Sequence, residues 1–334
     1  MSLRIERPGL SSTIQDLGRF GFQRYGVPVA GALDPLAARL ANALVGNDPG
    51  EAVLEILALG PSFTVEAESV RLALVGSDVG LTIDGNRIEP DRSVTAARGA
   101  KVAIGGFTNT ACCVLAVEGG FDLPSVMGSR STYVRGGFGG LAGRALKAGD
   151  MLPLRRAAAA AGPELRAGAI EYGKGPIRIV LGPQEDWFEP SSVAQFLAEP
   201  YEITAEADRM GMRLSGPKLV HSRGFNIVSD GIATGALQVP GTGQPIVLLT
   251  DHQTVGGYPK IGTVISADLP RLGRMRPGAH IRFTAIEPAE AEAMRQAQET
   301  ALARLIAEIG PVTAVPRTED LLKANLISGV VRAE

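Results

Sequence analysis

Short apolar runs separated by glycine-rich turns make up most of the chain, and this pattern predicts many short β-strands. The runs are rich in Val, Ile, Leu and Thr, which favour strands, and the 42 glycines recur between them, where turns are needed. The predicted strands are Val70–Val75, Lys101–Ile104, Cys112–Val117, Ile177–Leu181, Ile246–Leu249 and Ile281–Ile286. We therefore expect a mainly β fold.

Apolar residues recur at helical spacing in two segments. Near residues 34–46, Asp34 is a suitable N-cap, Pro35 suits the first helical position, and Leu and Ala residues supply an apolar face. The segment Glu287–Ile309 has apolar side chains at helical spacing, which predicts an amphipathic C-terminal helix. We expect this helix to pack against the rest of the molecule, and partner binding is the alternative.

An alanine-rich segment divides the chain into two β regions of similar size. Its alanine run ends at Gly162 and Pro163 and shows no strand periodicity, so we predict a linker at 155–168. The other predicted parts are a first β subdomain at 1–154, a second at 169–286, and a helix with a tail at 287–334. The two β regions could be duplicated folds whose sequences have diverged.

The charge balance excludes several classes of partner. The 334 residues include 33 Lys and Arg against 35 Asp and Glu, a net charge of -2, and the basic residues are scattered. Nucleic acid and membrane surfaces are therefore not expected as partners. The first residues lack a secretory signal pattern, and no apolar stretch is long enough to span a membrane. Cys112 and Cys113 are adjacent and poorly placed for a disulfide, which favours the cytoplasm.

Several familiar site motifs are absent or incomplete. The three histidines, His221, His252 and His280, lack ligand spacing, so no metal site is expected on this chain. The segment 168–174 begins like a phosphate-binding P-loop, but Gly175 stands where Ser or Thr must hold magnesium. Neither a Gly-x-Ser-x-Gly elbow nor a biotin-accepting Met-Lys-Met occurs.

Two polar segments in the first half could bind an anion. Gln15, Asp16 and Arg19 open a loop that continues through Tyr25–Pro28, and Arg19 could hold a carboxylate or phosphate. The alternative is a structural ion pair between Asp16 and Arg19. The other segment is a glycine-rich loop that contains Ser129, Arg130 and Arg144 and could present hydroxyl and backbone N–H groups. The alternative there is a surface loop.

Two further polar segments lie in the second half. If residues 208–213 are extended, Arg209, Gly211 and Arg213 share one face, although solvated arginines would look the same. The segment 238–260 is the richest, because it combines amide, carboxylate, hydroxyl, phenol and ammonium groups with two adjacent glycines. In it Asp251 could hold magnesium or act as a base, and Lys260 could neutralise phosphate. We expect His252 to be exposed.

Taken in order, the segments Gln15–Arg19, Tyr25–Pro28, Leu40–Asn47, Gly128–Thr132, Asp208–Gly211 and Asp251–Gly262 resemble the signatures of the biotin-dependent carboxyltransferase-like family. Its members include the C subunits of bacterial 5-oxoprolinases, the kinase-inhibitor antagonist and half of the urea carboxylase carboxyltransferase domain. The resemblance runs from about Pro8 to Phe283 and implies two tandem cyclophilin-like β-barrel subdomains. The chain departs from the family pattern at Ala30, His252, Val255 and Arg274, the last of which stands in place of glutamine.

The resemblance implies a subunit that opens 5-oxo-L-proline to L-glutamate, driven by ATP, together with a lactam-utilisation-type A subunit and a kinase-inhibitor-like B subunit. ATP and Mg²⁺ would act at the level of the complex, with no biotin bound to this chain. Phosphorylation of the lactam oxygen would activate the amide. The alternatives are carboxyl transfer from carboxybiotin to urea or a related amide, and a non-catalytic antagonist that binds a B-type subunit.

The site residues that we expect fall into two groups. The catalytic candidates are Asp16, Arg19, Arg130, Asp251 and Lys260. The substrate-binding candidates are Gln15, Tyr25, Ser129, Arg144, Arg209, Arg213, Gln238, Gln253, Thr254 and Tyr258. The sequence does not separate residues that contact substrate from residues that contact a partner, because both kinds of surface favour arginine, tyrosine and glycine loops.

Overall fold

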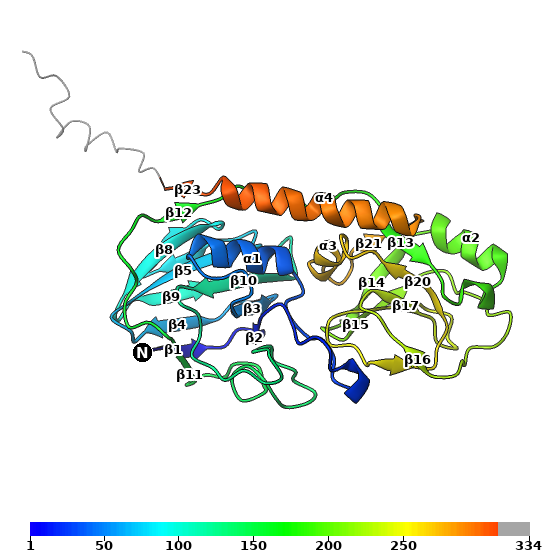
Figure 1. The fold of residues 1–334 in the computed structure, drawn as a ribbon, viewed down its shortest axis with the longest axis horizontal. Helices are drawn as coiled ribbons and strands as arrows, with labels where there is room; N and C mark the ends of the chain where they lie inside the picture. The colour runs from blue at the N-terminus through cyan, green and yellow to red at the C-terminus, as the bar shows by residue number, and fades with distance from the viewer. Residues whose placement is uncertain (313–334) are drawn as a thin grey trace, which may run out of the picture.

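The computed structural model describes residues 1–312, which fold into two β halves joined along one side by a long helix (Figure 1). The prediction of a mainly β fold with short helices and a C-terminal helix is confirmed. No helix among the described residues is long and apolar enough to cross a membrane.

Two facing sheets build the first half. One contains β1 (Ser2–Arg7), β4 (Ser62–Val65), β6 (Leu81–Ile83), β7 (Asn86–Ile88), β9 (Lys101–Ile104) and β11 (Met151–Pro153), in the order β11-β1-β4-β9-β6-β7. The other contains β2 (Ser11–Gln15), β3 (Val53–Leu57), β5 (Ser69–Val75), β8 (Arg92–Ala97), β10 (Cys112–Val117), β12 (Leu165–Arg166) and β23 (Gly310–Pro311), in the order β2-β3-β10-β5-β8-β12-β23. Their inner faces share one apolar core, to which Leu3, Phe63 and Leu115 belong.

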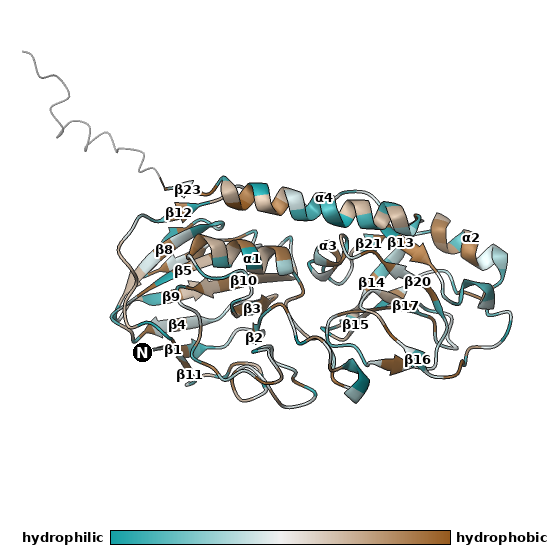
Figure 2. Ribbon diagram, in the orientation of Figure 1, coloured by the Kyte–Doolittle hydropathy of each residue, from teal (hydrophilic) through white to brown (hydrophobic). Residues whose placement is uncertain are grey.

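Helix α1 (Pro35–Leu44) explains why β10 is apolar at every position. Asp34 caps the N-terminus of this helix, because its Oδ1 accepts a hydrogen bond from Ala37 N at 3.0 Å, and Pro35 occupies the first helical position. The helix covers the outer face of β10, so Val114 packs against α1 while Leu115 points into the core between the sheets. Figure 2 shows this hydrophobic concentration on β3 and β10.

The second half is one eight-stranded sheet that curls into a nearly closed barrel. Its strands are β13 (Ile177–Leu181), β14 (Tyr201–Ala207), β15 (Gly211–Ser215), β17 (Ala236–Gln238), β18 (Ile246–Leu248), β20 (Lys260–Val264), β21 (His280–Ile281) and β22 (Phe283–Ala285), in the order β21-β14-β15-β18-β17-β20-β13-β22. The two edge strands are separated in sequence only by Arg282, so the edges must lie close together. The prediction of one strand at Ile281–Ile286 was therefore wrong, because this segment divides to serve both edges.

Shorter elements surround the barrel. They are the 3-10 turns η1 (Gln23–Tyr25) and η2 (Glu185–Trp187), the helices α2 (Pro190–Ala198) and α3 (Leu269–Gly273), and the two-stranded ribbon of β16 (Asp230–Gly231) and β19 (Val255–Gly256). The barrel core includes an aromatic cluster in which Phe196 stacks on Phe283 with ring centroids 4.7 Å apart. Such pairs add stability beyond simple burial.

Helix α4 (Pro288–Ala307) packs across both halves, in the segment where the sequence predicts a C-terminal helix. Leu302 is buried against α1, and Arg39 of α1 pairs with Glu299 at 2.7 Å. The side chain of Gln298 donates to the carbonyl of Ala267 in the second half at 2.7 Å. Within the segment 155–168, which the sequence predicts as a linker, Leu165 and Arg166 form β12 and extend a sheet of the first half. The predicted tail beyond residue 312 lies outside the described residues.

One buried carboxylate gives a pH-dependent prediction. Burial raises the pKa of Asp91 to about 6, against the opposing effects of the Gly76 amide and the charge of Arg274. The ionised form is therefore disfavoured in the fold, and this cost is absent below about pH 4 and complete above about pH 6. We expect Asp91→Asn to raise the free energy of unfolding by roughly 1–2 kcal/mol at pH 7.5, less than the full shift implies because solvent screens the site.

Urea denaturation at pH 4.5 and pH 7.5 tests this prediction. Asparagine suits the position, because residue 91 has a φ of 57° and asparagine tolerates the left-handed region. We expect Asp91→Asn to have a higher free energy of unfolding than the wild type at pH 7.5 and nearly the same value at pH 4.5. An equal gain at both values would contradict the assigned protonation.

Candidate functional site

Asp16 organises the loop that follows Gly128. The sequence left open whether Asp16 instead forms an ion pair with Arg19. Asp16 Oδ1 accepts hydrogen bonds from Ser129 Oγ at 2.7 Å and Ser131 Oγ at 2.5 Å, and its Oδ2 accepts one from Arg130 N at 2.6 Å. Gly18 N also donates to Oδ1. The alternative of a structural Asp16–Arg19 ion pair was therefore wrong, because the carboxylate bonds to the loop.

Arg19 is almost completely buried, at 1% exposure, and is held mainly by neutral groups. Its Nη2 donates to Ser131 O at 2.5 Å, and its guanidinium lies 4.9 Å from the ring centroid of Phe138. Gly139 has to be glycine, because a Cβ there would lie 2.0 Å from Ser131 O. Burial lowers the pKa of Arg19, although Asp16 and Asp251 oppose this. Asp16 and Arg19 thus hold the loop at residues 129–131 in place through hydrogen bonds.

Arg209 connects the two halves through a buried ionic network. Its Nε and Nη2 donate to Asp251 at 3.0 Å and 2.9 Å, its Nη1 donates to Glu55, and its Nη2 also donates to Gly31 O at 2.7 Å. Glu55 lies on β3 of the first half and is 1% exposed. The expectation that Arg209, Gly211 and Arg213 share one face was wrong for Arg209, because β15 begins only at Gly211.

A cavity of about 560 Å³ lies on the outer face of the barrel, where a loop of the first half approaches. Arg213 is paired in register with Ile246, and Ile246 with Gln238, so these three side chains form a row across β15, β18 and β17. Their neighbours Met212, Leu214 and Val247 point into the barrel core. The lining residues are Arg135, Ala205, Glu206, Ala207, Asp208, Met210, Gly211, Arg213, Gln238, Ile246, Leu248, Gln253 and Tyr258.

Two amide side chains in this cavity have unused hydrogen-bonding groups. Gln253 Nε2 donates to Gln238 Oε1 at 3.1 Å. Gln238 Nε2 and Gln253 Oε1 are buried and make no hydrogen bond within the described residues. One is a donor and the other an acceptor, and leaving such groups unpaired is costly. A ligand that carries its own amide group would satisfy both atoms once the two side chains rotate toward the cavity.

Charged residues flank the amide pair. Arg213 pairs with Glu206 at 2.8 Å, and Arg135 of the first half pairs with Asp208 at 3.7 Å, and all four side chains are more than half exposed. Exposed pairs of this kind are weak and can exchange partners. No group of three His, Cys, Asp or Glu side chains in residues 1–312 is placed to hold a metal ion.

Comparison with known proteins agrees with this architecture. The family model described as carboxyltransferase domain, subdomain A and B, matches residues 25–285, which is most of the chain. The chain belongs to this carboxyltransferase family. The expected family resemblance is confirmed.

Within the carboxyltransferase family, the chain is similar to two kinds of protein. It is 38% identical over 298 residues to the C subunit of 5-oxoprolinase from Escherichia coli strain K12, covering 89% of this chain and 95% of that protein. It is 30% identical to the urea amidolyase of Saccharomyces cerevisiae over 97% of this chain, but this is 19% of the yeast protein. The crystal structure of the K. lactis urea amidolyase matches with a TM-score of 0.84 and 27% identity, over 91% of this chain and 20% of that one.

Lys260 of this carboxyltransferase-family chain lies beside the amide row. The register pairs it with Gln238, but its side chain is 3% exposed and its Nζ binds Asp230 of the β16 ribbon at 2.9 Å. His252 was expected to be exposed and is instead fully buried, with Nδ1 2.6 Å from Gln253 O and Nε2 3.2 Å from Thr234 Oγ1. Burial lowers the pKa of this imidazole, which favours its neutral form.

The remaining predicted residues lie outside the cavity. Gln15 is buried and donates to Thr132 O at 3.1 Å, whereas Tyr25 is exposed on η1. Arg144 holds Asp150 through two hydrogen bonds of 2.7 Å and 2.8 Å. Thr254 accepts a backbone hydrogen bond from the amide of Ile232 at 3.1 Å. Gln15, Arg144 and Thr254 therefore stabilise the fold through hydrogen bonds within the protein.

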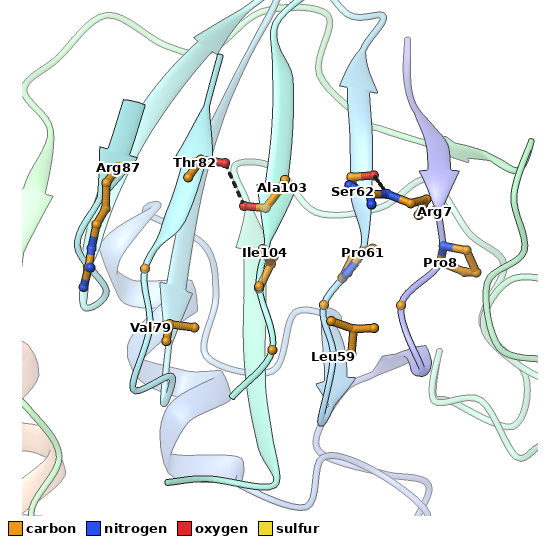
Figure 3. Close-up of a pocket in the computed structure, with 15 residues that line it drawn as sticks. Arg7, Pro8, Leu59, Pro61, Ser62, Val79, Thr82, Arg87, Ala103 and Ile104 are labelled. Atoms are coloured by element: carbon orange, nitrogen blue, oxygen red, sulfur yellow. Dashed lines mark hydrogen bonds between the residues drawn. The ribbon is translucent and has the colours of Figure 1, made fainter. Parts of the chain in front are cut away.

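A larger cavity of about 640 Å³ lies elsewhere, on the first half (Figure 3). It is bordered by Arg7 and Arg87 on opposite sides and is lined mostly by glycines, prolines and small apolar residues. None of the predicted site residues lines it. Size alone therefore does not identify the site, and we take the cavity with the paired amides as the candidate.

Sequence reasoning missed two residues that shape this region. Glu55 holds Arg209, and its position gave a signal, because a charged residue interrupts the apolar run Val53–Leu57. Arg135 lies in a glycine-rich loop of the first half and enters the cavity only through the fold. Nothing in its local sequence distinguishes it from a solvated arginine.

Proposed function

We propose that this chain is the C subunit of an ATP-dependent 5-oxoprolinase and that it supplies a lactam-binding pocket to the complex. The observation that carries the proposal is the pair of half-satisfied amides, Gln238 and Gln253, on the wall of the 560 Å³ cavity. The similarity to the C subunit of the Escherichia coli 5-oxoprolinase, over nearly the whole of both chains, supports it.

The polar groups of the cavity complement those of 5-oxo-L-proline. A lactam offers one N–H donor and one carbonyl acceptor, which Gln253 Oε1 and Gln238 Nε2 can satisfy after small rotations of their side chains. The substrate carboxylate can then bind Arg213 or Arg135 in place of a weak surface ion pair. Held in this way, the lactam would be oriented for attack on its activated carbonyl.

Carboxyl transfer to urea is the second candidate, and the similarity of almost the whole chain to part of the yeast urea amidolyase favours it. Urea has the same amide groups but carries no charge. The two arginines at the cavity would have no counterpart in urea, which is why we favour the carboxylate-bearing lactam.

Partner subunits would complete the site. Exposed apolar side chains occur in two segments: Phe225, Val228 and Val255 lie in or shortly before the strands of the β16–β19 ribbon, and Phe20 and Tyr25 lie in or shortly before η1. Both elements lie along the lower edge in Figure 1. Apolar surface of this kind is typical of a protein interface. We propose that a B-type subunit binds here, that an A-type subunit joins the complex, and that the complex works in the cytoplasm.

The cavity itself does not suit magnesium. Its carboxylates, Glu206 and Asp208, are both engaged by arginines, and the groups beside them are amides and a phenol. Mg²⁺ prefers free oxygen ligands, chiefly carboxylates and phosphates. We therefore place no magnesium in this cavity.

Reconstitution tests the proposed function. The purified chain is mixed with the A-type and B-type subunits, and ATP hydrolysis and glutamate formation are followed with and without 5-oxo-L-proline. We expect both to require this chain, and each single omission is the control. Biotin-dependent carboxylation of urea would move the chain to the second function, and a stable complex without turnover would indicate an antagonist.

A further inference from the structure

A second polar cleft lies between the two halves, away from the amide pair. Its volume is about 340 Å³, and it is lined by Thr108, Asn109, Tyr172, Gly173, Arg271, Arg274, Met275, Arg276 and Ala279. The first two residues come from the first half, the next two from the connecting segment, and the others from α3 and the chain that follows it. Three of the nine lining residues are arginines and none is acidic.

The arginines are fixed in place by groups that leave much of their charge uncompensated. Arg271 Nη2 donates to Gly175 O at 2.5 Å, and Arg276 Nη1 donates to Phe107 O at 3.1 Å, so both side chains are held by neutral carbonyls. The other guanidinium nitrogens of these two residues make no hydrogen bond within residues 1–312. Burial is the main cause that lowers the pKa of Arg271.

Arg274 is the inner wall of the cleft. Its Nη1 lies 3.3 Å from Asp34 Oδ2, and its guanidinium lies 4.3 Å from the ring centroid of Tyr172, whose hydroxyl also donates to Asp34. Its charge is thus largely balanced by a fully buried carboxylate. The same contacts fix the shape of the cleft, because they join α1, the connecting segment and the second half.

Three more acids, Asp268, Asp78 and Asp91, lie behind the lining. Asp268 is engaged by Arg178, whose Nε donates to it at 3.0 Å. Asp78 accepts hydrogen bonds from the backbone N–H groups of Thr108 and Asn109 at 2.9 Å and 2.7 Å. Asp91 lies near Arg274, whose charge opposes the rise in the pKa of this carboxyl. Arg274 is thus matched by Asp34 and Asp91, whereas Arg271 and Arg276 form no ion pair within residues 1–312. These two guanidinium groups give the cleft its positive charge.

We propose that this cleft binds an oligophosphate, such as the phosphate tail of a nucleotide. Guanidinium forks match the tetrahedral oxygens of phosphate, and several phosphates can engage Arg271 and Arg276 together, which a single carboxylate cannot do. The cleft is within the size range of small-molecule sites. This inference goes beyond the proposed function and does not depend on lactam binding.

The glycine-rich segment 168–174 lies at the edge of the cleft, since Gly173 lines it and Gly175 O accepts from Arg271. It leads into strand β13 and not into a helix, so it is not a P-loop, but it adds a cation beside the cleft. Lys174 lies between Gly173 and Gly175 and is exposed.

Calorimetric titration of the isolated chain with sodium tripolyphosphate, at low salt, tests the proposal. We expect saturable binding that weakens as salt is added. The double variant Arg271→Gln/Arg276→Gln should lower the affinity about tenfold or more, since it removes two charges and their hydrogen bonds to phosphate. The matched control, Arg87→Gln/Arg223→Gln, removes the same charge from exposed sites and should change the affinity less than about twofold.

Further titrations separate the possible outcomes. Tighter binding of ATP than of tripolyphosphate would show that the nucleoside also makes contacts, and equal binding would limit the site to the phosphates. The variant Arg271→Lys/Arg276→Lys keeps the charge and should lose less affinity than the glutamine variant, which separates phosphate binding from misfolding. Absence of binding to the wild-type chain at millimolar tripolyphosphate, or an equal loss in the control variant, would overturn the proposal.

Discussion

Replacement of Arg209 by methionine should lower the free energy of unfolding by about 3–5 kcal/mol, because it leaves two buried carboxylates without their partner. Glu55 is 1% and Asp251 8% exposed, and Arg209 binds both. Burial already raises the pKa of Glu55 against the opposing charge of Arg209. Without Arg209 the ionised carboxylate becomes still less favourable, so the loss of stability should be larger at pH 7.5 than at pH 5.

Chemical denaturation followed by circular dichroism measures this effect. The triple variant Glu55→Gln/Arg209→Met/Asp251→Asn removes the uncompensated charges and should recover part of the lost stability. Arg213→Met, on the same segment but exposed, is the matched control and should change stability by less than about 0.5 kcal/mol. If Arg209→Met were equally mild, the buried network would not be what joins the two halves.

The largest effect on activity is expected from Gln238. Replacement by leucine keeps a similar size but removes the donor that we propose for the lactam carbonyl and the acceptor that positions Gln253. In the reconstituted complex we expect kcat/KM for 5-oxo-L-proline to fall about 10- to 100-fold, mainly through KM, because a lost hydrogen bond in a buried site costs roughly 1–3 kcal/mol.

A glutamine in the same barrel provides the control. Gln244 donates to Gly216 O at 2.9 Å and does not line the cavity, so Gln244→Leu should affect stability and leave KM nearly unchanged. A Gln238→Leu complex with normal KM would remove the amide pair from substrate recognition. A loss confined to kcat would instead indicate that Gln238 acts on the activated state.

The sequence predicted the local elements well because their causes are local. Apolar runs bounded by turn residues identified strands such as Cys112–Val117, and Asp34 with Pro35 identified the start of α1. The sequence predicted one strand at Ile281–Ile286, whereas the structure has two short strands there. Closure of the barrel decides where the segment divides. Nothing within this segment encodes that closure.

The candidate site was less predictable, because its parts are distant in sequence. Arg209 and Glu55 are 154 residues apart, and Arg135 meets the barrel only through the docking of the two halves. The sequence identified Arg213, Gln238, Gln253 and Tyr258 as polar residues in polar segments, and the fold brings these four into one cavity. It could not separate them from Asp16 or Arg209, whose side chains bond within the protein.

The most direct test of the central claim is a crystal structure of the reconstituted complex with 5-oxo-L-proline and a non-hydrolysable ATP analogue. We predict the lactam in the cavity of this chain, with its amide on Gln238 and Gln253 and its carboxylate on Arg213 or Arg135. A lactam bound wholly by the partner subunits, with this cavity empty, would contradict this prediction.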